Sequence, residues 1–417
     1  MVSRSTERLL DWVIFALAFT FASFRPTVFA IGYPVLAHVF NNGPIATAFW
    51  ALATALASWV LIRNDQFDSY AQRFRKNPFL LLFIALALSS VFWSIQPILT
   101  LYCALELLFA TLLGVYFGLR HSPEKILEAL FWFGVVIVFL SYFFVIRVPN
   151  VGTMPGYPSG IFWRGIFWHR NHLGSMMAFF QAVYLLRFFL GIFRHNSLAL
   201  LDAIFFVLSL VLVVMSQSAT GSILTIFLDG LLLAGLVWLR VRQFLKPIHY
   251  YALGAAAVAG SILLFANLDF VFGLFNRSPS MTGRVPMWGY LLQHVVPERP
   301  WLGYGFGAIW RQKAFQVQVQ QAVGWPFPVL IGDNGYMDIL LYLGGIGLAL
   351  FMASLVSMAF YIVRYLLRHP SLLSFFPFLV LAHALVANIS FSLFLELEAF
   401  VWLMVVLSYS LSLRARE

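Results

Sequence analysis

Charged residues are scarce in this chain. Asp, Glu, Lys and Arg make up 10% of its 417 residues, whereas soluble domains contain roughly 25%. Most of the chain therefore does not face water, which excludes an ordinary soluble enzyme. The chain also has a single cysteine, Cys103, which lies inside an apolar run. An internal disulfide is therefore excluded, and the cysteine says little about the compartment.

Long apolar runs are what the chain has instead. Hydrophobic residues make up 62% of the sequence, and they recur in runs of about 17–25 residues, the length of a helix that crosses a bilayer. The first run is not followed by a small-residue cleavage site, so we expect it to remain as a membrane helix. We predict an all-α integral membrane protein with about 12 transmembrane helices. Their expected ranges are about 9–31, 45–62, 78–93, 98–118, 126–146, 171–190, 198–215, 220–239, 249–267, 336–363, 372–390 and 394–413.

The basic residues predict the orientation of these helices. The net charge of +10 does not indicate nucleic acid here, because Lys and Arg lie between the apolar runs. About 17 of the 26 basic residues fall at the two ends of the chain and in alternate connections. Cytoplasmic connections are enriched in Lys and Arg. We therefore expect both termini to be cytoplasmic, in a multi-pass membrane protein.

The opposite, extracytoplasmic side has two long connections, about 147–170 and 268–335. Residues 1–417 are expected to form one polytopic membrane domain, with 268–335 as its one large extracytoplasmic loop. Within that loop, the polar stretch 311–321 is a candidate surface helix. Loops of this length in a compact protein are usually functional.

Three arginines in these outer loops are candidates for anion binding: Arg164, Arg170 and Arg284. Arginine is disfavoured on the outer side, so those that occur there need a reason. A guanidinium group matches the oxygens of a phosphate. The alternative is a solvated loop, or ion pairs with acidic residues such as Asp333. The outer loops show no convincing cluster of metal ligands, and we predict neither a metal nor a cofactor.

The first long loop re-enters the membrane with the sequence GIFWHRNHLG at 165–174. Asn171 is a candidate cap for the next helix, and a helix N-terminus attracts anions. His169, Arg170 and His172 would lie at that helix N-terminus as substrate-binding residues. The alternative is an anchor at the membrane interface, with Trp168 in the aromatic belt.

A second polar stretch, VMSQSATGS at 214–222, separates two apolar runs. Ser216, Ser218 and Thr220 could donate hydrogen bonds to phosphate or sugar. A tight turn between two helices explains the same stretch, and taken alone it is the preferred interpretation.

A third stretch, GDNGYMD at 332–338, precedes a predicted membrane helix. Asp333 is a candidate general base, with Asn334 and Tyr336 as neighbouring substrate-binding candidates. Simple capping of the helix by a carboxylate is the alternative.

Two further features point to other classes of protein. The segment GYGFG at 303–307 is not a nucleotide-binding loop, because no strand precedes it and no Lys-Ser/Thr ending follows. Acidic residues in or near the apolar runs, namely Glu106, Asp229, Glu396 and Glu398, would suit an ion-coupled transporter or a lipid flippase.

Taken together, the motifs resemble those of the O-antigen ligase and O-antigen polymerase superfamily of membrane glycosyltransferases. The matching elements, in the order in which the family has them, are GIFWHRNHLG, SQSATG, TGRVPMW, PWLGYGFG and DNGYMDILLYLGGIG. The resemblance covers about residues 160–350 well, and the rest of the chain only by helix count.

This resemblance implies a GT-C-type glycosyltransferase architecture and a polyprenyl-diphosphate-linked oligosaccharide as the substrate. The reaction would invert the anomeric centre without a metal, on the periplasmic face of the bacterial inner membrane. Arg170 and Arg284 match the family arginines that bind the diphosphate. Family ligases usually have a histidine where this chain has Asp333, so its motif is more similar to those of exopolysaccharide repeat-unit polymerases. An O-antigen ligase that transfers glycan to lipid A-core is the alternative, and a chain-length regulator is a candidate partner.

Overall fold

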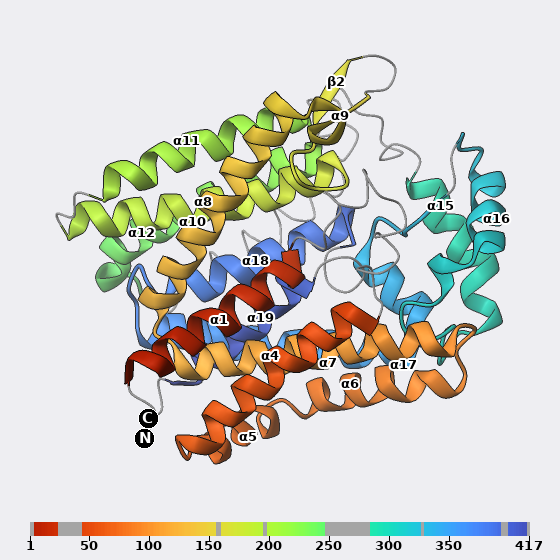
Figure 1. Cartoon of the computed structure of the whole chain (residues 1–417), viewed down its shortest axis with the longest axis horizontal. Helices are drawn as coiled ribbons and strands as arrows, with labels where there is room; N and C mark the ends of the chain where they lie inside the picture. Colours follow the sequence, from red (N-terminus) through yellow and green to blue (C-terminus); the bar gives the residue numbers. More distant parts are fainter. Residues whose placement is uncertain are drawn as a thin grey trace.

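The computed structural model describes residues 4–23, 44–155, 160–194, 198–246, 284–326, 329–392 and 399–414. Within these ranges the chain is helical apart from one short hairpin, in which β1 (Thr153–Pro155) pairs antiparallel with β2 (Ile161–Trp163) (Figure 1). The predicted helical membrane class is supported, with this hairpin as an addition that was not predicted.

The described residues up to Tyr290 contain eleven α-helices, eight of which overlap predicted spans. They are α1 (Arg4–Ser23), α4 (Pro44–Arg63), α5 (Phe67–Arg75), α6 (Pro78–Ser89), α7 (Pro97–Arg120), α8 (Pro123–Arg147), α9 (Pro149–Gly152), α10 (Arg170–Phe193), α11 (Ala199–Ser216), α12 (Ala219–Val241) and, after the undescribed residues 247–283, α15 (Arg284–Tyr290). The short helices α5, α9 and α15 were not predicted.

The C-terminal part contains α16 (Lys313–Val323), α17 (Gly335–Arg368), α18 (Phe375–Ser390) and α19 (Ala399–Ser412). Helix α16 confirms the surface helix expected near 311–321. Single turns of other helix types complete the described structure: Ser90–Phe92, Arg242–Phe244, Leu291–Val295, Val296–Glu298 and Ile309–Arg311.

The predicted number of about 12 transmembrane helices is not confirmed. Among the described residues, seven helices are long and apolar enough to cross a membrane, or eight if the bent pair α5 and α6 is counted as one span. Helices α18 and α19 are apolar but shorter. The predicted span 249–267 lies outside the described residues, as do residues 24–31 of the first predicted span.

Several helices begin where local chemistry dictates. The Asn77 side chain accepts a hydrogen bond from Leu80 N at 3.2 Å, and Ser218 accepts one from Gly221 N at 3.1 Å. Both satisfy backbone donors that lack a partner in the first turn of a helix. Pro78 and Pro97 occupy the first helical positions of α6 and α7, where the missing N–H of proline costs nothing.

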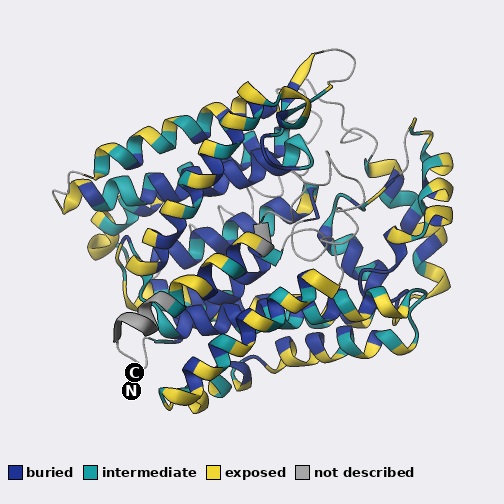
Figure 2. Cartoon of the chain, in the orientation of Figure 1, coloured by how far each residue is buried: buried dark blue, intermediate teal, exposed yellow. Residues whose placement is uncertain are grey.

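Helix α19 lies at the centre of the bundle. Every residue from Phe400 to Ser412 is buried, and in Figure 2 the helix is almost uniformly dark blue. It packs closely against α7 (Pro97–Arg120). Gly114 permits this contact, because a Cβ atom there would lie 2.9 Å from Leu403 O. Small residues allow membrane helices to approach in this way.

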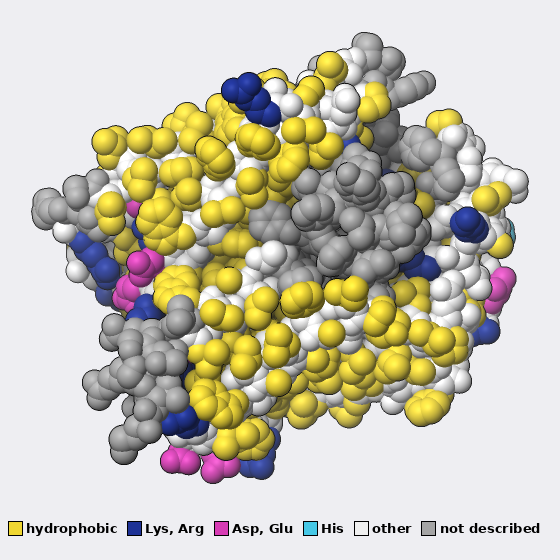
Figure 3. Space-filling view, viewed as in Figure 1, with side chains coloured by type: hydrophobic (Ala, Val, Ile, Leu, Met, Phe, Trp, Pro, Cys, Tyr) yellow, Lys and Arg dark blue, Asp and Glu magenta, His cyan; other side chains and the backbone are white. Residues whose placement is uncertain are grey.

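The outer surface of the bundle is apolar. Hydrophobic side chains cover most of the face in Figure 3, while basic and acidic side chains lie mostly toward its margins. Exposed side chains include Phe92, Ile98 and Phe139. Apolar surface of this extent suits a hydrocarbon environment rather than water.

Polar groups from the predicted cytoplasmic connections meet at one end of the bundle. Arg120 lies 3.6 Å from Asp11 and 3.3 Å from Gln66, and Arg194 lies 3.8 Å from Glu124. The hairpin, α15 and α16 lie at the opposite end (Figure 1). In the part of the chain that the structure describes, these two groups of connections therefore lie at opposite ends of the bundle.

Helix α17 is broken at Gly344, which has φ +65° and ψ −166°. An irregular segment docks onto the break through its backbone. Gly345 N donates to Pro300 O at 2.7 Å, while Tyr304 N donates to Leu341 O at 2.9 Å. A break inside a membrane helix leaves backbone groups without partners, and each costs free energy unless another group supplies one. The glycine-rich segment therefore completes the hydrogen bonding of α17.

We expect Gly344→Ala to destabilise the protein by at least about 1 kcal/mol, because a positive φ is strained for alanine and its Cβ would contact the Trp301 backbone. The matched control is Gly345→Ala, whose Cβ would meet Pro300 O only at 3.4 Å. Thermal unfolding in detergent measures both variants. Equal melting temperatures for the two would contradict the role assigned to the break.

Candidate functional site

The first part of the candidate site is the segment that leads into α10. Gly152 O accepts hydrogen bonds from both Arg164 N and Gly165 N at 2.9 Å, which folds this segment back onto α9. Gly165 has φ +59° and packs against Ser141, so glycine is needed at this turn. The chain then enters α10 at Arg170.

His169 caps α10, rather than Asn171 as the sequence suggested. Its Nδ1 accepts a hydrogen bond from Asn171 N at 3.2 Å. An Nδ1 that accepts cannot carry the proton in neutral imidazole, so the proton resides on Nε2. His169 therefore offers a hydrogen-bond donor at the N-terminus of α10.

Arg170 lies over this entrance to the helix. Its Cζ lies 4.0 Å from the centre of the Phe162 ring in β2, and its Nη1 donates to Gln217 O at 3.2 Å. Gln217 has φ +49° and forms the turn between α11 and α12. The guanidinium is thus positioned by the hairpin on one side and by the helical turn on the other.

Arg164 mainly forms hydrogen bonds to backbone carbonyl groups near its own loop. Its Nε donates to Val151 O at 2.8 Å, and its Nη2 donates to Asn150 O at 3.2 Å. Burial lowers the pKa of this guanidinium. These contacts hold the loop together and leave Arg164 less available than Arg170 for a ligand.

The second part of the site is the loop 332–334 in front of α17. The Nε of Arg284 lies 3.0 Å from Oδ2 of Asp333, and the two side chains are 13% and 20% exposed. Asp333 has φ +49°, which is uncommon for a residue other than glycine. Asn334 caps α17 by accepting from Tyr336 N and Met337 N, each at 3.0 Å. Capping of α17 is therefore done by Asn334, which leaves the Asp333 carboxylate for another role.

His169 is within the electrostatic range of arginines from both parts of the site. Burial, together with the positive charges of Arg170, Arg284 and Arg164, lowers the pKa of this histidine to about 4. All three arginines therefore act on the same point, although they come from different loops. The lowered pKa makes His169 a poor candidate for a general base.

Other predicted residues lie deeper. His172 is buried, with its ring 4.2 Å from that of Phe167. Ser216 and Ser218 are buried in the turn between α11 and α12, where Ser216 Oγ donates to Val213 O at 2.6 Å. Thr220 Oγ1 lies 2.9 Å from Ser390 Oγ. These hydroxyls stabilise the turn that supports Arg170, which favours the structural interpretation of this stretch.

Tyr336 also faces the protein. Its hydroxyl donates to Leu385 O in α18 at 3.1 Å. The intramembrane Asp229 accepts two hydrogen bonds from Gln181 Nε2, at 2.9 and 2.7 Å, which link α12 to α10. Glu396 and Glu398 lie outside the described residues.

Sequence reasoning missed several supporting residues. Phe162 and Gln217 hold Arg170, and Trp288 Nε1 donates to Gly332 O at 2.8 Å. None of them has a motif of its own. The one available signal was spacing, because Trp288 follows Arg284 by one helical turn on α15.

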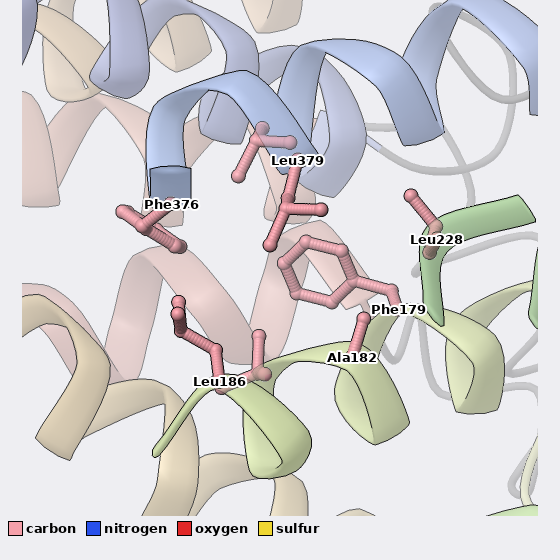
Figure 4. A pocket seen from close by; sticks show the side chains of 8 residues that line it. Phe179, Ala182, Leu186, Leu228, Phe376 and Leu379 are labelled. Carbon is pink, nitrogen blue, oxygen red and sulfur yellow. The ribbon is translucent and has the colours of Figure 1, made fainter. Parts of the chain in front are cut away.

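Two features of the described residues do not contribute chemistry. A small apolar pocket lies between α10, α12 and α18, lined by side chains such as Phe179, Leu228 and Phe376 (Figure 4). It offers no polar group to a substrate. Among the described residues no group of three or more His, Cys, Asp or Glu side chains could hold a metal ion.

Residues 204–352 match the model of a protein family described as O-Antigen ligase. The resemblance to the O-antigen ligase and polymerase superfamily is confirmed. The matched region includes the turn that supports Arg170 and the loop that carries Asp333, and it contains Arg284. No curated protein matches the chain. An enzyme of the ligase or polymerase type is thereby supported.

We expect His169 to titrate near pH 4 and therefore to be neutral at pH 7, because burial and the three arginines disfavour its charged form. NMR of histidine-labelled protein in detergent, with His169→Gln to assign the signal, measures this. An ordinary pKa near 6.5 would contradict the clustering of the arginines around His169.

Proposed function

We propose that this protein is a polymerase of polyprenyl-diphosphate-linked oligosaccharide repeat units, with a GT-C-type architecture and an extracytoplasmic active site. The observation that carries the proposal is the ion pair between Arg284 and Asp333 in front of α17, with Arg284 and Arg170 both close enough to lower the pKa of His169. A cluster of arginines suits a diphosphate. A carboxylate beside that cluster suits the activation of a sugar hydroxyl.

In the proposed reaction, a hydroxyl group of the acceptor sugar attacks the anomeric carbon of the donor glycan. The bond from that carbon to the phosphate oxygen breaks, and polyprenyl diphosphate leaves with the electron pair. The hydroxyl proton passes to Asp333. Attack from the face opposite the leaving group inverts the anomeric centre.

Arg284 is placed to contact both the proposed base, Asp333, and the diphosphate leaving group. Its Nε holds Asp333 at 3.0 Å, and a guanidinium group has two further nitrogens that can fork onto phosphate oxygens. Arg170 and the Nε2 donor of His169 would contribute further hydrogen bonds to the diphosphate. Preorganised donors of this kind stabilise the charge that develops on a leaving group.

A carboxylate group is in general a weak base toward a sugar hydroxyl group. The hydroxyl proton need not transfer early, since a late transfer suffices if the hydrogen bond to Asp333 orients the hydroxyl group. His169 and His172 are less suitable, because the first is surrounded by arginines and the second is buried. Asp333 is thus the best-placed base among the described residues.

The second candidate function is glycan ligation to lipid A-core. The description of the matching family, O-Antigen ligase, favours it. The two functions share donor chemistry and differ in the acceptor. Asp333, at a position where family ligases usually have histidine, favours polymerisation.

We expect the purified protein to convert lipid-linked repeat units, extracted from cells that lack this chain, into a ladder of longer glycans. Gel electrophoresis of the products measures this, with lipid A-core added in a parallel reaction as the competing acceptor. A product with one glycan on lipid A-core and no ladder would establish ligation instead. Because arginines rather than a metal neutralise the diphosphate in this proposal, EDTA should leave the rate unchanged.

We expect Arg284→Ala or Arg170→Ala to raise the barrier by roughly 2–4 kcal/mol, the scale for loss of one preorganised donor. Arg284→Lys should recover little, because a point charge cannot hold Asp333 and two phosphate oxygens together. The ladder assay measures the rates. The matched control is Arg311→Ala, an exposed arginine in the same outer loop. A similar loss in the control would mean that general positive charge, and not this cluster, carries the effect.

A further inference from the structure

A buried carboxylate lies directly behind the candidate base. Asp338, in the first turn of α17, is 2% exposed. Its Oδ1 accepts hydrogen bonds from Trp310 Nε1 at 2.7 Å and from Gly332 N at 3.2 Å, and its Oδ2 accepts one from Ser392 Oγ. Buried carboxylates are costly unless they are hydrogen-bonded, and this one has three donors from three separate segments.

One of these donors belongs to the loop that carries Asp333. The N–H of Gly332 is held by Asp338, and the C=O of Gly332 is held by Trp288 Nε1 at 2.8 Å. The residue that precedes Asp333 is thus fixed on both sides of its backbone. Asn334, the residue that follows, is fixed as the cap of α17.

Such fixing is what the backbone of Asp333 requires. A residue other than glycine with φ +49° is held in a sparsely populated conformation, which persists only when its surroundings determine it. Without the Asp338 contact, the loop could relax and carry the Asp333 carboxylate away from Arg284. The fit is tight, because a Cβ atom added to Gly332 would collide with Oδ1 of Asp338.

We propose that Asp338 is a positioning residue, which holds the Gly332 peptide so that Asp333 keeps its place beside Arg284 and the acceptor hydroxyl. This inference rests on the proposed function of Asp333 and deepens it. Asp338 takes up no proton in the reaction and touches no substrate. Its carboxylate acts only by holding the backbone conformation of the loop 332–334.

Variants of Asp338 distinguish the effect of its hydrogen bonds on the loop conformation from the effect of its negative charge. Asp338→Asn retains an oxygen for Gly332 N and Trp310 Nε1, and its amide can donate to Ser392 Oγ. We therefore expect Asn to keep most of the turnover, whereas Asp338→Ala lowers it on the order of a hundredfold, the scale for a misplaced reacting group. Ser392→Ala leaves both contacts to Oδ1 in place, so it should cost much less than Asp338→Ala. Gly332→Ala, which displaces the same carboxylate from the other side, should resemble Asp338→Ala.

The decisive measurement is a double-mutant cycle in the ladder assay. If Asp338 acts through Asp333, then Asp338→Ala should add little to the loss already caused by Asp333→Asn. Binding of undecaprenyl diphosphate and thermal unfolding, measured on the same preparations, should remain close to wild type. These two readouts show whether each variant still forms the arginine cluster.

Several outcomes would overturn the inference. They are losses that multiply in the double variant, an Asp338→Asn variant as inactive as Asp338→Ala, full activity of Asp333→Asn, or loss of diphosphate binding in Asp338→Ala. A wild-type protein that joins the glycan to no acceptor overturns the proposed function itself, and this inference with it. If the wild type ligates to lipid A-core instead, the same cycle on that product tests Asp338 unchanged.

Discussion

The break in α17 is the constraint on which the rest of the site depends. Within a membrane, backbone N–H and C=O groups must find partners inside the protein. At Gly344 the helix loses its own pairing, and the segment from Pro300 to Gly305 supplies replacements in both directions. The same segment also binds the turn between α6 and α7, where Ile95 N donates to Tyr304 O at 3.1 Å. The outer end of α17 is thereby fixed against the bundle.

Because this end of α17 is fixed, the loop 332–334 that precedes the helix is fixed as well. The chain from Trp310 to Asp338 starts beside the docked segment and returns to α17, where Trp310 Nε1 meets the Asp338 carboxylate. Asp333 lies at the tip of this return, opposite Arg284. The charged side chains of the site are therefore supported by backbone hydrogen bonds and buried polar contacts, which are less easily displaced by water than exposed ion pairs.

The membrane helices were predictable from sequence because a single physical requirement, the length of an apolar run, determines them. The run at 171–190 became α10 (Arg170–Phe193), and the run at 198–215 became α11 (Ala199–Ser216). Features that depend on contacts between distant segments were not predictable. The hairpin, the amphipathic helix α5 and the break at Gly344 are examples, since Gly344 lies in an unbroken apolar run and the segment that docks onto it begins some forty residues earlier.

The same distinction applies to the candidate site. Arg170 and Asp333 were proposed as site residues because each occurs in a polar motif beside an apolar run, and Arg284 because it lies in a long loop and matches a motif of the family. Hydrogen-bond partners were not identified. The contact between Asp338 and Ser392, for example, joins the first turn of α17 to a residue just after the end of α18. A hydroxyl group such as that of Ser216 cannot be assigned from sequence, since donation to a ligand and donation to Val213 O require the same residue type.

A carboxylate at position 333 has a consequence that a histidine there would not have. In the proposed reaction, Asp333 becomes neutral when it accepts the proton, so Arg284 loses its counter-charge as the diphosphate gains negative charge. The full positive charge of the guanidinium then acts on the leaving group. A histidine would instead become a cation beside Arg284, and the two would repel. Coupling of proton acceptance to charge release is therefore a physical reason for an aspartate to serve at this place, despite its weak basicity.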